Sequence, residues 1–142
     1  MEQIKKMLHE GNRSLVVRTD TDEIFAFDGR GISDLLQLLN ESPYLLDGAL
    51  VADKVVGKAA AALMILGGVK AVFADTVSEP ALQLFASAAP EVDVTCNNKV
   101  EYIINRTRTG WCPMELACKD AKTPEECLGN IKAKLEELKA IK

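Results

Sequence analysis

Apolar side chains follow two different spacings along the chain, and the spacing changes at turn residues. Segments 14–19 and 23–28 are strand-like, and the polar turn between them predicts an antiparallel hairpin. Two nearly continuous apolar stretches, 48–53 and 69–75, are typical of strands that are covered on both faces. Residues 58–66 between them are apolar on every side, so we expect a buried helix that joins two adjacent parallel strands.

The remaining elements complete an α/β pattern. Turn residues bound helices over 1–10, 31–42, 78–89 and 124–141, a short helix that starts at Cys112, and strand-like pieces at 92–95 and 99–104. Strands that alternate with helices after an opening hairpin indicate one sheet with helices on both faces. Because no linker or repeat interrupts the pattern, we expect a single α/β domain over 1–142 with a C-terminal helix over 124–141.

Composition and charge restrict the classes of function. The chain has 142 residues and a formal net charge of -4, with acidic and basic residues spread along its length. It lacks the electropositive face of a duplex-binding protein, so we expect no nucleic-acid partner. No segment approaches the roughly 20 apolar residues of a bilayer-spanning helix, and the charged N-terminus does not resemble a signal peptide. We therefore expect a soluble, cytoplasmic protein without a membrane partner, and we expect its cysteines to be reduced.

Two strand-to-helix turns are candidate ligand sites, because ligands of open α/β sheets bind outside the carboxyl ends of the strands. In each turn an aspartate at the expected strand end faces a helix N-terminus, where backbone N–H groups are free to bind an anion. The candidate ligand-binding residues at these turns are Asp53, Lys54, Gly57, Lys58, Asp75 and Ser78.

The pair Gly57-Lys58 invites comparison with a phosphate-binding loop. A P-loop needs a glycine where Ala52 stands and a serine or threonine where Ala59 stands, so the motif is absent. Two interpretations remain open. Lys58 can hold an anionic group of a ligand at the helix N-terminus, or Gly57 only permits close packing and Lys58 is solvated.

A second group of candidate residues surrounds Cys112. Cys112 and Glu115 stand at the N-cap and N3 positions of a short helix, which is a sufficient structural account of both. A thiol at a helix N-terminus near Arg106 and Arg108 is also favoured as a reactive thiolate, with Glu115 as a candidate for proton transfer. Trp111 either fills the core or forms a wall for a stacked ligand. The catalytic candidates are therefore Cys112 and Glu115, and Arg106 and Trp111 join the candidate binding residues.

Several stretches resemble one known family. The segments "VADKVVGKAAAALMILGGVKAVFAD", "SEPAL", "INR" and "GWCPMELAC" are similar to an uncharacterised bacterial family, a domain of unknown function whose fold resembles that of cytidine deaminases. The resemblance implies a three-layer α/β/α sandwich on a mixed five-stranded sheet. It implies no activity, because the family has none assigned.

The zinc motifs of deaminases can be compared residue by residue. These enzymes carry H-x-E at the start of one helix and P-C-x-x-C at the start of the next. Here the corresponding helix starts read Gly57-Lys58-Ala59 and Ser78-Glu79-Pro80, and His9 lies in the first helix, far from the cysteines in sequence. We therefore expect no metal, no cofactor and no hydrolytic deamination.

Two hypotheses about function remain. In the first, the chain is a binding module with a deaminase-like cleft that holds an anionic small molecule. In the second, it is a metal-free enzyme with Cys112 as nucleophile or redox thiol. The sequence leaves a homo-oligomer open. Both hypotheses expect the helix starts at Gly57 and Cys112 to face one shared cleft.

Overall fold

The computed structural model describes residues 1–11, 13–29, 32–104, 110 and 112–140. In chain order, its helices and strands are α1 (Glu2–Glu10), β1 (Leu15–Arg18), β2 (Ile24–Phe27), α2 (Ser33–Glu41), the 3-10 helix η1 (Pro43–Leu45), β3 (Leu50–Val56), α3 (Lys58–Gly67), β4 (Ala71–Ser78), α4 (Glu79–Ala88), β5 (Asp93–Val100), α5 (Pro113–Cys118) and α6 (Pro124–Ala140). No helix among the described residues is long and apolar enough to cross a membrane.

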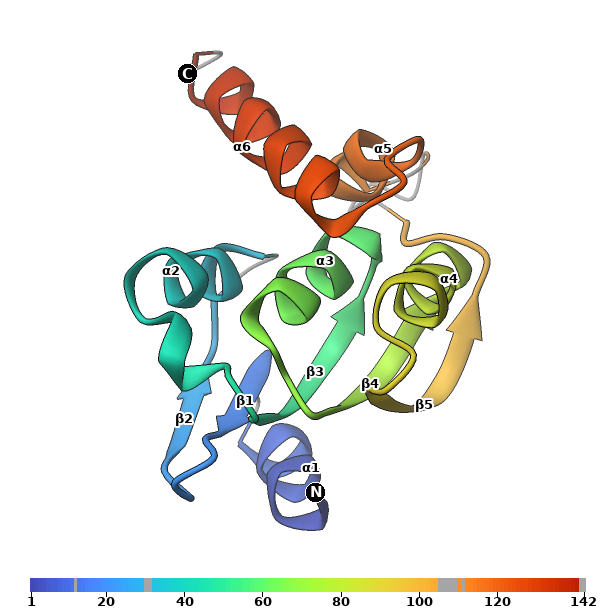
Figure 1. Cartoon of the computed structure of the whole chain (residues 1–142). Helices are drawn as coiled ribbons and strands as arrows, with labels where there is room; N and C mark the ends of the chain where they lie inside the picture. The colour runs from blue at the N-terminus through green and yellow to red at the C-terminus, as the bar shows by residue number, and fades with distance from the viewer. Residues whose placement is uncertain (12, 30–31, 105–109, 111, 141–142) are drawn as a thin grey trace.

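The strands form one mixed, open sheet in the order β2-β1-β3-β4-β5 (Figure 1). Strand β1 is antiparallel to β2 and β3, whereas β3, β4 and β5 run parallel. The predicted hairpin and the predicted parallel pair β3/β4, joined by helix α3, are both confirmed. As a result, the carboxyl ends of β3, β4 and β5 lie at the same edge of the sheet, where α3 and α4 begin.

Helices α2, α3 and α4 cover one face of the sheet and enclose the larger core, and α6 packs on α3 from outside (Figure 1). Side chains Ala59–Met64 of α3 are buried because this helix has neighbours on every side. At its end, a Cβ atom on Gly67 would lie 2.7 Å from the side chain of Leu46, so only glycine permits this approach. Gly68 then ends the helix in a left-handed conformation with φ of 83°.

Helix α1 packs on the opposite face of the sheet, against β1 and β3. The smaller core on this side consists of Ile4, Leu8, Val16, Ala52 and Phe73. Beyond α1, the side chains of edge strand β5 are mostly exposed. This face therefore keeps an open part next to β4 and β5.

The prediction for the last strand needs correction. The pieces predicted at 92–95 and 99–104 are one strand, β5, over Asp93–Val100. Because β5 is a mostly exposed edge strand, it has no apolar alternation, and its polar middle resembles a break in the sequence. The last helix is described as far as Ala140, so residue 141 of the predicted range lies outside the described residues.

Candidate functional site

The N-terminus of α3 is occupied by a carboxylate of the same chain. The backbone N–H of Lys58 donates to Glu115 Oε1 at 2.7 Å, and the N–H of Ile103 donates to Glu115 Oε2 at 2.9 Å. The Glu115 residue is 2% exposed. A helix N-terminus favours negative charge, and here Glu115 from helix α5 supplies it.

Gly57 makes room for this carboxylate. A Cβ atom at this position would lie 3.2 Å from both carboxylate oxygens of Glu115 and 3.1 Å from Ile103 Cγ1. The side chain of Lys58 points away from Glu115 toward the chain after α5, where its Nζ donates to the carbonyls of Lys119, at 3.2 Å, and Ala121. Lys58 is 9% exposed, so it is buried rather than solvated as one interpretation of the sequence held. These two hydrogen bonds connect the start of α3 to the segment that follows α5.

Cys112 occupies the N-cap of α5, as predicted, and is half-buried. Its backbone N–H donates to the Ile103 carbonyl at 2.7 Å, and its carbonyl accepts a hydrogen bond from Leu116 N–H. The thiol itself does not cap the helix. Glu115 therefore joins the starts of α3 and α5. The shared cleft that the sequence predicts between them stays a prediction. Arg106, Arg108 and Trp111 lie outside the described residues.

The prediction that Asp53 and Asp75 end their strands and face helix N-termini is wrong. Strand β3 continues to Val56 and β4 to Ser78, so both aspartates lie inside strands. Ser78 is the residue at the strand-to-helix junction: its Oγ accepts a hydrogen bond from Ala81 N–H at 3.2 Å and caps α4.

Asp53 lies inside β3, and its Oδ1 accepts a hydrogen bond from Val55 N–H at 3.3 Å. Burial of the carboxyl group raises the pKa of Asp53 to about 7, and the nearby charge of Asp34 adds to the increase. The backbone N–H of the neighbouring Lys54 donates to the Ser14 carbonyl at 3.1 Å. Asp53 is therefore a half-buried acid whose pKa is raised well above its ordinary value.

Asp75 faces α1 on the opposite side of the sheet. His9 Nε2 lies 2.7 Å from Asp75 Oδ1 and donates to it, and Asn97 Nδ2 of strand β5 donates to the same oxygen at 3.0 Å. We call His9, Asp75 and Asn97 the histidine cluster. It joins α1, β4 and β5 at the open part of the sheet, so the partners of His9 are Asp75 and Phe73 rather than a cysteine.

Aromatic and cationic neighbours support the histidine cluster. The His9 ring meets the buried Phe73 ring edge to face, with centroids 6.0 Å apart, and Lys5 Nζ lies 4.5 Å from the centroid of the same ring. The side chain of His9 is 46% exposed and that of Asp75 is 26% exposed. Because Asp75 holds Nε2, the ring is oriented, and Nδ1 makes no hydrogen bond with the described residues.

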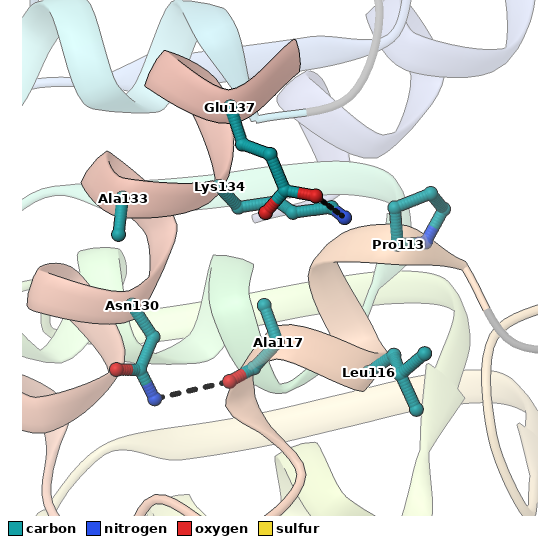
Figure 2. Close-up of a pocket in the computed structure, with 7 residues that line it drawn as sticks. All are labelled: Pro113, Leu116, Ala117, Asn130, Ala133, Lys134 and Glu137. Atoms are coloured by element: carbon teal, nitrogen blue, oxygen red, sulfur yellow. Dashed lines mark hydrogen bonds and ion pairs between the residues drawn. The ribbon is translucent and has the colours of Figure 1, made fainter.

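A separate groove lies between α5 and α6 (Figure 2). Its volume is about 390 Å³, and the described residues that line it are Pro113, Leu116, Ala117, Asn130, Ala133, Lys134 and Glu137. Lys134 is paired with Glu137 at 3.3 Å, and Asn130 Nδ2 donates to the Ala117 carbonyl at 3.0 Å, so its polar side chains already have partners. Among the described residues, none of the predicted site residues lines this groove.

The described part of the chain contains no cluster of metal-ligand side chains. No group of three or more histidine, cysteine or acidic side chains there could hold a metal ion.

Cys118 and Cys127 are buried side by side, with Cys118 Sγ 3.8 Å from the Cys127 carbonyl. The hydrogen bond with Cys127, together with burial, raises the pKa of the Cys118 thiol.

Comparisons with known proteins agree with the fold. A family model described as a domain of unknown function (DUF1893) matches residues 3–135. The structure is similar to the crystal structure of a DUF1893 family protein from Thermotoga maritima, with a TM-score of 0.84 and 25% sequence identity over 94% of this chain and 88% of that chain. No curated protein matches the chain.

Proposed function

Because the chain belongs to the DUF1893 family, a domain of unknown function, we propose its function from its geometry: it is a binding module for an anionic small molecule, held at the histidine cluster. The ligand class is a molecule with a carboxylate or phosphate group. Its oxygen accepts a hydrogen bond from Nδ1 of protonated His9. Asp75 keeps the ring in the orientation that this contact needs.

The observation that carries the proposal is the 2.7 Å contact between His9 Nε2 and Asp75 Oδ1. A half-exposed imidazole that is oriented by a carboxylate, with its second nitrogen available, is a polar group prepared for a further partner. Lys5 Nζ, which is paired with Glu2 at 3.3 Å, is a cation on the same face of the sheet, over the Phe73 ring. These groups come from elements far apart in sequence and meet beside the open part of the sheet.

The site differs from the one that the sequence favoured. At the N-terminus of α3, Glu115 already holds the N–H of Lys58, and the Lys58 ammonium is bonded to two carbonyls. An incoming anion there would have to displace a buried carboxylate of the chain itself. The histidine cluster needs no such displacement, which is why we place the ligand at His9. The deaminase-like cleft implied by the resemblance stays a prediction.

The alternative is a metal-free enzyme with Cys112 as nucleophile or redox thiol. Its proposed proton carrier, Glu115, has each carboxylate oxygen engaged by a backbone N–H, so the geometry supports this alternative less well than binding. A catalytic Cys112 would need a different acid or base.

Ligand-induced stabilisation tests the binding proposal. Inorganic phosphate, added at constant ionic strength, should raise the thermal unfolding temperature of the wild-type protein. His9→Gln should lose this increase, whereas Lys70→Gln, which changes an exposed lysine away from the cluster, should keep it. An equal increase in His9→Gln and wild type, or none in the wild type, would overturn the proposal.

A further inference from the structure

Cys118 and Cys127 form a buried pair of thiols between α5 and α6, two helices that pack on each other (Figure 1). Cys118 is the last residue of α5 and Cys127 lies near the start of α6, and both residues are 0% exposed. Cys118 Sγ lies 3.8 Å from the Cys127 carbonyl oxygen, and the two thiols are hydrogen-bonded to each other. A disulfide requires two sulfurs that can meet in this way.

The segment between the two cysteines is held in place by contacts of its own. Lys122 N–H donates to Glu126 Oε2 at 3.1 Å, and Glu126 N–H donates to Thr123 Oγ1 at 3.2 Å, which caps the start of α6. Asn130 Nδ2 donates to the Ala117 carbonyl at 3.0 Å and holds the end of α5 against α6. A bond between the thiols would therefore join helix ends that already lie together.

A buried cation lies beside the thiol pair. Lys58 Nζ donates to the carbonyls of Lys119 and Ala121, which both belong to the segment between the cysteines. The hydrogen bond with Cys118 lowers the pKa of the Cys127 thiol, and the charge of Lys58 acts in the same direction. Cys127 is thus the thiol that ionises first, and the thiolate is the form that attacks a disulfide sulfur.

We propose that Cys118 and Cys127 are a modification site, which exchanges with low-molecular-weight disulfides to form an intrachain disulfide. The Cys127 thiolate attacks one sulfur of the small disulfide RSSR, and the other sulfur leaves as RS⁻ and takes up the proton that Cys127 released. Cys118 then loses its proton and attacks the Cys127 sulfur of the mixed disulfide, which releases the second RSH. In sum, two protein thiols are oxidised to one disulfide, and one RSSR is reduced to two RSH.

Because both sulfurs are covered in the folded protein, the exchange proceeds through local opening of α5. This helix has six residues and lies at the surface, where its Leu116 is 56% exposed. Short peripheral elements open at a lower free energy than the core does. The exchange is therefore slow, and its equilibrium rather than its rate reports on the fit of the disulfide to the fold.

The disulfide would secure the contacts at the start of α3. It links positions nine apart, and the loop that it closes contains both carbonyls bound to Lys58. A cross-link lowers the conformational entropy of the unfolded chain, so the oxidised protein should be the more stable form. The inference does not rest on the proposed function, since the thiols belong to the core under α3 and the histidine cluster adjoins the core under α1.

An exchange equilibrium with reduced and oxidised glutathione tests the pair. The variant Cys96→Ser/Cys112→Ser keeps Cys118 and Cys127 as its only thiols. Mass spectrometry measures the fraction of this double variant that carries the disulfide, once in the folded state and once in urea. The equilibrium constant for disulfide formation should be about tenfold or more larger in the folded state, because a bond that stabilises the fold is stabilised by the fold to the same extent.

Thermal unfolding of the same double variant supplies a second measurement. Its oxidised form should unfold at a temperature about 4 °C or more above that of its reduced form. A further Cys118→Ser change, which leaves Cys127 without a partner, should abolish this difference. Oxidation should not alter the increase that phosphate causes, so a failure here is distinguishable from a failure of the proposed function. An equilibrium constant that is equal or smaller in the folded state, or an oxidised form that is no more stable than the reduced one, would overturn the proposal.

Discussion

Glu115 Oε1 accepts a hydrogen bond from the backbone N–H of Lys58 at 2.7 Å. The place where an α/β fold offers N–H groups to an anionic ligand is thereby filled by an acid of the same chain, and the neighbouring Lys58 ammonium is engaged by backbone carbonyls. The arrangement favours a structural role for Glu115 and Lys58, and we therefore propose ligand recognition at the opposite face of the sheet.

Removal of the Glu115 carboxylate should destabilise the fold. Glu115→Ala leaves the N–H groups of Lys58 and Ile103 without their acceptor, and an unsatisfied buried donor costs about 1–3 kcal/mol. We expect a loss of about 3 kcal/mol in the free energy of unfolding, measured by urea denaturation. Glu91→Ala, at an exposed position, is the matched control. Equal stability of the two variants would show that the Glu115 contacts contribute nothing.

Lys58→Met keeps the apolar stem of the side chain and removes the ammonium. Because Nζ donates to the Lys119 and Ala121 carbonyls in a buried setting, we expect a loss of about 2 kcal/mol in stability. Phosphate binding should be unchanged. A variant that is as stable as the wild type but no longer binds phosphate would return the ligand site to the N-terminus of α3.

Asp53 should make the stability depend on pH. Its pKa is raised from 3.8 to about 7 in the folded protein, so the folded state binds the proton more tightly than the unfolded state. This contribution is fully present below about pH 4 and is lost as the pH rises toward 7. Asp53→Asn cannot ionise and lacks this loss. The free energy of unfolding of the variant relative to that of the wild type should therefore increase between pH 5 and pH 8, by a few kcal/mol at most. A difference that stays constant over this range would contradict the raised pKa of Asp53.

The four cysteines should react with iodoacetamide in an order set by exposure. Cys96 is exposed and should be alkylated first, whereas Cys118 and Cys127 are buried and should react only on unfolding. Half-buried Cys112 separates the two functional hypotheses. Mass spectrometry that finds Cys112 modified faster than Cys96 at neutral pH would favour the enzyme alternative over the binding module.

The local parts of this structure could be predicted from the sequence. The apolar stretches around α3 specify a parallel β3-α3-β4 unit, and the end of α3 at Gly68 and the cap at Ser78 follow from residue chemistry within a few positions. Each of these features depends on near neighbours in the chain, so a single sequence contains the necessary information.

The contacts that define the candidate site are not local. Glu115 has the position of an N3 acid in its own helix, yet it caps α3, 57 residues away. His9 meets Asp75 across 66 positions because α1 packs its apolar Ile4 and Leu8 on the back of the sheet. Helical periodicity predicts that α1 buries this stripe, but it does not say against which strand. The partner of His9 therefore could not be predicted.

The most direct test of ligand binding is a titration of the His9 ring by nuclear magnetic resonance. His9 is the only histidine in the chain, so its ring nitrogen signals are assigned without ambiguity. Added phosphate at constant ionic strength should shift the Nδ1 signal along a saturable curve, and Asp75→Asn, which loses the orienting carboxylate, should weaken the apparent affinity about tenfold. A linear shift equal to that caused by sodium chloride would contradict a ligand site at the histidine cluster.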